Sequence, residues 1–122
     1  MAKVWIANFA GHPYVPAEKF GELCYLTRGY VSLGNLDRLV YDIVEKLADT
    51  EEDDYLLLSG LCIIGTVAAA AWMLRHGRVK ILHWDKKNTD YQLLEIKKGQ
   101  IERMFDVFLI REAEEKWTAE NE

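Results

Sequence analysis

Short apolar segments and longer helical repeats alternate along the chain and divide it into predicted strands and helices. We expect strands at Lys3–Phe9, Glu22–Thr27, Tyr55–Leu58 and Val79–Trp84, each a mostly apolar segment of strand length. Tyr55–Leu58 has four apolar residues in a row without alternation, which is typical of a strand buried on both faces of a parallel sheet. This segment should therefore lie at the centre of the sheet.

Three segments have helical spacing. Asn35 is a plausible N-cap for an amphipathic helix whose apolar positions are Leu36, Leu39, Val40, Ile43, Val44 and Leu47. Leu61–Leu74 has no charged residue, which predicts a helix buried on all sides that ends at Gly77. It is too short to span a bilayer, which needs about 20 apolar residues. A third helix should hold Ile101, Met104, Phe105, Phe108 and Leu109 and extend toward Trp117.

Glycine, proline and polar clusters mark the connections. Ala10–Gly21 holds two prolines and two glycines and reads as a long loop. Asp85–Thr89 reads as a hairpin turn that leads to an antiparallel edge strand at Asp90–Ile96, which Gly99 ends. Thr118–Glu122 is expected to fray.

This order of elements predicts a small Rossmann-like α/β sandwich, in which a mostly parallel sheet carries an antiparallel edge hairpin. Residues 1–122 should form a single α/β domain. The second, third and fourth strands should run parallel and be joined by two helical crossovers. The C-terminal helix should pack on the sheet or on a partner.

Charge and cysteine content narrow the classes of function. The net charge is −5 and the acidic residues concentrate in Asp49–Asp54 and Glu112–Glu122, which argues against nucleic-acid binding. Cys24 and Cys62 stand in apolar contexts, so we expect a reduced, cytoplasmic compartment and no membrane association. His12, His76 and His83 are scattered and do not have the spacing of metal ligands, so we expect neither a metal nor a cofactor, and His12 in the long loop is the one histidine to test.

The best candidate for a ligand site is the turn after the central strand. Ser59-Gly60 opens a helix at the carboxyl end of a parallel strand, where open α/β sheets bind ligands and helix N-termini favour anions. If the second and third strands are neighbours, Arg28 should converge on the same crevice, with an aromatic residue beside it. The candidate binding residues are Thr27, Arg28, Gly29, Tyr30, Asn35, Ser59 and Gly60. Alternatively, Ser59 caps the helix and Arg28 pairs with the acidic segment Asp49–Asp54.

Three classes of function remain, in the following order. The first is non-catalytic binding of a small anionic, nucleotide-like ligand at the strand ends. The second is a protein-interaction or structural homo-oligomer, since Leu61–Leu74 needs more cover than a chain of 122 residues supplies alone. An enzyme ranks last, because the sequence has no paired acid and base, no metal set and no activated nucleophile. The familiar P-loop, G-x-G-x-x-G and nucleophile-elbow motifs are also absent. Cys62 reads as a small buried hydrophobe rather than a nucleophile.

Overall fold

The computed structural model describes residues 1–11 and 13–121. In this part of the chain the elements are β1 (Lys3–Phe9), the 3-10 helix η1 (Val15–Phe20), β2 (Glu22–Arg28), α1 (Leu36–Leu47), β3 (Tyr55–Leu57), α2 (Cys62–His76), β4 (Arg78–Asp85), β5 (Asp90–Lys97) and α3 (Lys98–Asn121).

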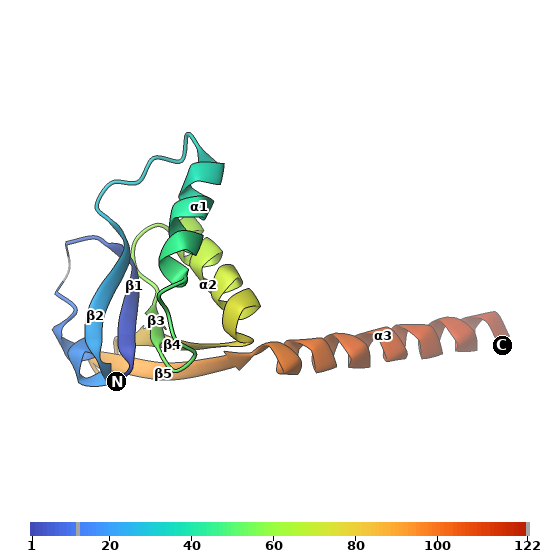
Figure 1. Cartoon of the computed structure of the whole chain (residues 1–122). Helices are drawn as coiled ribbons and strands as arrows, with labels where there is room; N and C mark the ends of the chain where they lie inside the picture. Colours follow the sequence, from blue (N-terminus) through green and yellow to red (C-terminus); the bar gives the residue numbers. More distant parts are fainter. Residues whose placement is uncertain (12, 122) are drawn as a thin grey trace.

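The strands form one mixed sheet in the order β2-β1-β3-β4-β5 (Figure 1). β1 to β4 run parallel, and β5 runs antiparallel to β4 at the edge, so the expected α/β class with an antiparallel hairpin is confirmed. β3 is the central strand, with Leu56 paired to Ile81 on one side and to Trp5 on the other. The assumption that β2 and β3 are neighbours is wrong, because β1 lies between them.

Two apolar cores cover the two faces of the sheet. Trp5 and Ala7 of β1 face the core beneath α1 and α2, whereas Val4 and Ile6 face a second core that η1 helps to close. This alternation follows from the two-residue period of a strand. Figure 1 shows α1 and α2 packed together on one side of the sheet. Burial on both faces explains the apolar residues Leu56 and Leu57 of the central strand, whereas Leu58, which was predicted to belong to this strand, follows it and is 46% exposed.

α1 begins as its sequence predicts, but it buries only part of its apolar positions, and Leu36 and Val44 remain exposed. The Asn35 side-chain oxygen accepts a hydrogen bond from the Arg38 amide at 3.1 Å, which caps the helix. Leu39, Ile43 and Leu47 are buried against the sheet and α2. Their spacing places them on one face of the helix, and the polar residues between them face water.

α2 corrects the expectation of a helix buried on all sides. Only Ile64, Ala68 and Trp72 are buried, along one face, while Leu74 is 80% exposed. Cys62 is also exposed, so its interpretation as a buried hydrophobe is wrong. Gly77 ends the helix with φ +76°, as expected, and its amide donates to the Met73 carbonyl oxygen.

The segment Ala10–Gly21 is more ordered than a loop reading implies. It contains η1, in which Ala17 is fully buried, and Tyr14 is only 5% exposed. Tyr14 therefore belongs to the second core rather than to an exposed loop. This short segment, rather than a full helix, covers the face of the sheet opposite α1 and α2.

Asp54 joins the amino ends of β1 and β3. Its carboxylate is 1% exposed and accepts hydrogen bonds from the amides of Lys3 and Glu51 and from Trp5 Nε1, each at 2.9 Å. A buried carboxylate is tolerated when its oxygens are satisfied in this way. These hydrogen bonds fix the register of β1 and β3 at the amino ends of the strands, whereas the candidate ligand-binding residues lie at the carboxyl ends.

α3 follows β5 directly and extends away from the rest of the molecule (Figure 1). Gly99 lies inside the helix and does not end β5, which continues to Lys97. None of the helical residues is buried, so α3 does not pack on the sheet of its own chain. The expected fraying from Thr118 is not seen up to Asn121, and Glu122 lies outside the described residues.

Candidate functional site

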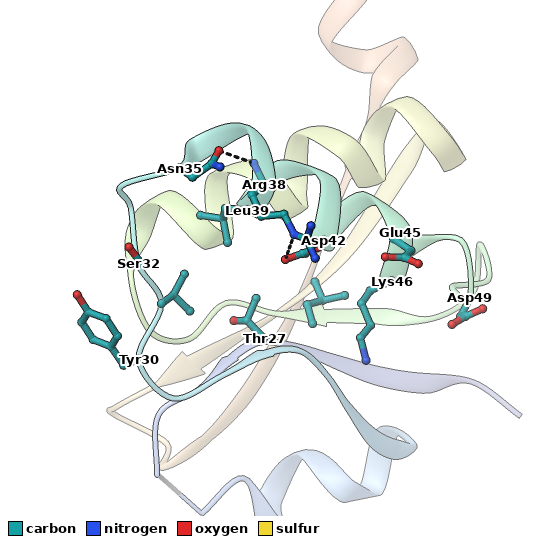
Figure 2. A pocket seen from close by; sticks show the side chains of 12 residues that line it. Thr27, Tyr30, Ser32, Asn35, Arg38, Leu39, Asp42, Glu45, Lys46 and Asp49 are labelled. Atoms are coloured by element: carbon teal, nitrogen blue, oxygen red, sulfur yellow. Dashed lines mark hydrogen bonds and ion pairs between the residues drawn. The ribbon is translucent and has the colours of Figure 1, made fainter.

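A cavity of about 680 Å³ lies between the carboxyl end of β2, the loop that follows it and α1. Three of the predicted ligand residues, Thr27, Tyr30 and Asn35, line it. Figure 2 shows Arg38, Asp42 and Lys46 on the wall formed by α1, with Lys46 extending toward the sheet. The predicted site therefore exists in part, but its charged side chains come from α1.

The charges around this cavity do not select an anion. Arg38 Nε lies 3.1 Å from Asp42 Oδ1, so the guanidinium already has a carboxylate partner. Lys46 is accompanied by Glu45 and Asp49 on the same rim. Carboxylates outnumber cations there, which favours a neutral or zwitterionic ligand over a phosphate.

Arg28 and Gly29 lie outside this lining. The Arg28 guanidinium stacks on the Tyr25 ring, with Cζ 4.3 Å from the ring centroid, in a cation–π contact. It does not pair with the acidic segment Asp49–Asp54 in any described contact. Gly29 has φ +63°, and its amide donates to the Phe9 carbonyl oxygen at 2.8 Å, which turns the chain after β2.

Ser59 and Gly60 take part in a polar cluster at the carboxyl ends of β1 and β3. The Ser59 hydroxyl lies 2.6 Å from the Tyr14 hydroxyl, and it does not cap α2, whose N-cap residue is Leu61. Gly60 has φ +85°, and a Cβ there would lie 2.7 Å from Asn8 Cβ. The glycine is needed for both its conformation and this close approach.

Asn8 is a residue of this cluster that the sequence reading missed. It is 5% exposed, and its Oδ1 lies 2.9 Å from the Thr27 hydroxyl, which also lies 2.7 Å from the Ala7 carbonyl oxygen. The available signal was a polar residue inside the otherwise apolar segment Lys3–Phe9, since buried polar side chains need partners. Asn8 thus connects Thr27 with the Gly60 turn.

A second cavity of about 350 Å³ opens beside this cluster, and Ser59 lines it together with aromatic residues. Tyr14, Trp84 and Tyr91 supply the aromatic walls, and the Trp84 and Tyr91 rings meet edge to face with centroids 5.0 Å apart. Burial raises the pKa of the Tyr91 hydroxyl, which keeps it protonated. Ser59 and Arg28 therefore do not share a crevice, because β1 lies between their strands.

The described residues contain no cluster of potential metal ligands. No three His, Cys, Asp or Glu side chains are grouped closely enough in this part of the chain to hold a metal ion. His76 ends α2 and contacts the Thr50 hydroxyl at 2.8 Å, while burial lowers its pKa. The prediction that His12 is the histidine to test lies outside the described residues.

α3 offers a different kind of site, an apolar surface without cover. Between Ile101 and Ile110 the helix exposes a dense group of large apolar side chains, and Phe105 is 63% exposed. At 100° per residue, one set of these side chains lies within an arc of about 200° around the helix axis, which we call the apolar arc. The members of this apolar arc are Ile101, Met104, Phe105, Val107, Phe108 and Leu109. Glu102, Arg103 and Asp106 occupy the opposite side, with Ile110 among them.

The chain belongs to the phage Pam3 gp32-like protein family. The match covers residues 3–98, which span β1 to the first residue of α3. No curated protein and no solved structure matches the chain. Among the described residues, no helix is long and apolar enough to cross a membrane.

Proposed function

We propose that this protein is a structural, self-assembling protein whose copies associate through α3. The observation that carries this proposal is the apolar arc, which stands in water on a helix that its own chain leaves uncovered. Monomeric proteins rarely expose a contiguous apolar surface of this kind unless another molecule binds it. Binding of a small anionic ligand, the function ranked first from the sequence, has weaker support, because the residues predicted to bind the ligand are divided between two cavities.

The total surface area supports association. A folded chain of 14.1 kDa is expected to expose about 6,700 Å². This chain exposes 8482 Å², an excess of about 1,700 Å². A stable interface of standard size buries about 800 Å² on each partner. The excess is therefore large enough for an interface of this size or larger.

Light scattering after size-exclusion chromatography, at about 10 to 100 μM protein, tests the proposal. We expect the full chain to form an oligomer and Phe105→Glu to be a monomer, because a carboxylate in an apolar interface has no partner. Ile110→Glu is the matched control: it introduces the same charge on the same helix, but on the side opposite the apolar arc. A monomeric full chain, or equal effects of the two variants, contradicts the proposal.

A small-ligand site is the second candidate, supported by the 680 Å³ cavity at the carboxyl end of β2. Open α/β sheets bind ligands beyond the carboxyl ends of their parallel strands, which supports a site at this end of β2. Thr27, Tyr30 and Asn35 would contact the ligand in this cavity. Titration with mono- and dinucleotides, with a neutral nucleoside beside them, separates an anionic from a neutral ligand.

A cytoplasmic location remains part of the proposal. Its support is that Cys24 and Cys62 are both free thiols, as in a reducing compartment.

A further inference from the structure

We infer that two copies of the chain pair through antiparallel α3 helices centred on Phe105. The inference rests on the proposed self-assembly and adds to it the orientation and the register of the two helices. The occupant of the apolar arc is thus a second copy of this chain, related by a two-fold axis.

The position of the apolar arc sets the register. It begins at Ile101 and ends at Leu109, so Phe105 is its midpoint. An antiparallel pair superposes this arc on itself only when the two-fold axis passes close to Phe105. Any other register would leave part of the arc in water or place it against charged residues that follow Leu109.

The charges along the same face decide the orientation. After Phe108, the charged positions nearest the midline of the apolar arc are Glu112 and Glu115, at i+4 and i+7, and Arg111 and Lys116 lie nearer its two borders. In a parallel pair each of these carboxylates would face the same carboxylate of the other copy, and like charges in contact are unfavourable at an interface. Glu112 and Lys98 both lie about 10 Å from Phe105, on opposite sides. An antiparallel pair therefore brings Glu112 of one copy beside Lys98 of the other.

Spin-label distances test the orientation in the full chain. Cys24→Ser and Cys62→Ser remove the native thiols, and Ala119→Cys carries a nitroxide label near the end of α3. We expect a distance of about 40 Å between the two labels of an antiparallel dimer, since each lies 14 residues from Phe105. A parallel pair would place them less than about 20 Å apart. An oligomer with the short distance overturns the inference and leaves self-assembly standing, whereas a monomer overturns both.

Disulfide cross-linking tests the register. In the same cysteine-free background, Lys98→Cys and Glu112→Cys proteins are mixed and oxidised. We expect a cross-link between the two different proteins and none within either protein alone. Cross-linking of Glu112→Cys with itself indicates a parallel pair, and the absence of the mixed product at a label distance of about 40 Å overturns the register centred on Phe105.

Discussion

Replacing Asp54 with Asn should remove a large part of the stability of this fold, although the change alters only one atom. The carboxylate is buried and accepts three hydrogen bonds, with one oxygen serving Lys3 N and the other serving Trp5 Nε1 and Glu51 N. In the variant, the NH₂ group must face one of these donors, so at least one bond is lost and two donors meet.

The magnitude follows from the number of bonds. A hydrogen bond to a charged group contributes about 1.5–3 kcal/mol, and a buried donor left unsatisfied costs about 1–3 kcal/mol. We therefore expect Asp54→Asn to lower the free energy of unfolding by about 2–4 kcal/mol. Small domains are stable by only about 5–15 kcal/mol, so the effect is easily measured.

Asp53→Asn is the matched control, because the same substitution is made one residue earlier. The Asp53 side chain is 79% exposed and pairs with Arg78 at 2.6 Å on the surface. Such pairs contribute about 0–1 kcal/mol. The contrast between neighbouring positions isolates the effect of burial and of the satisfied carboxylate.

Guanidinium denaturation followed by tryptophan fluorescence and circular dichroism measures both variants. The measurements belong in the Phe105→Glu background, where self-association cannot add a concentration dependence. We expect Asp54→Asn to lower the guanidinium concentration at the midpoint of unfolding without changing the slope of the unfolding free energy against guanidinium concentration. If Asp54→Asn and Asp53→Asn differ by less than about 0.5 kcal/mol, the carboxylate does not hold β1 and β3 together as argued.

Two further predictions concern the Gly60 turn and His76. Gly60→Ala should destabilise the protein more than Gly77→Ala: both residues have positive φ, which costs about 1–2 kcal/mol for alanine, but only Gly60 would place a Cβ against Asn8. Equal losses of melting temperature would refute the role of Asn8. Burial, with Arg75 nearby, lowers the pKa of His76, so the unfolded chain binds a proton more readily than the folded one. The stabilisation that comes from neutral His76 is present above the pKa of this residue in the unfolded chain, about 6.5. It is lost as the pH falls through the lower pKa of His76 in the folded protein. The free energy of unfolding should therefore decrease between pH 7.5 and 5.5, and His76→Gln, which keeps a donor for Thr50, should flatten this decrease.

The strand and helix types were local properties that the sequence determined. α1 follows from a polar cap and a stripe of Leu39, Ile43 and Leu47, and both act within a few turns of the chain. The apolar run of β3 required cover on both faces, which placed that strand at the centre. The hairpin between β4 and β5 followed from the polar turn between two strand segments. Each of these features depends on neighbouring residues alone.

The order of the strands was decided only by tertiary structure. β1 separates β2 from β3, and local periodicity is the same whichever parallel strand is the neighbour. This one difference places Arg28 away from the Ser59 turn and inserts Asn8 between Thr27 and Gly60. The candidate ligand residues were recognised individually, but their grouping depended on a long-range choice.

The cover of the helices was also a tertiary property. A sequence pattern shows that α2 and α3 carry apolar side chains, but it does not show which surface lies against them. In α2 the sheet and α1 cover one face and leave Leu74 exposed. No described part of the chain covers α3, because β5 ends at Lys97 and the helix continues outward from the edge of the sheet. Burial is a property of two surfaces, and the sequence of a segment describes only one of them.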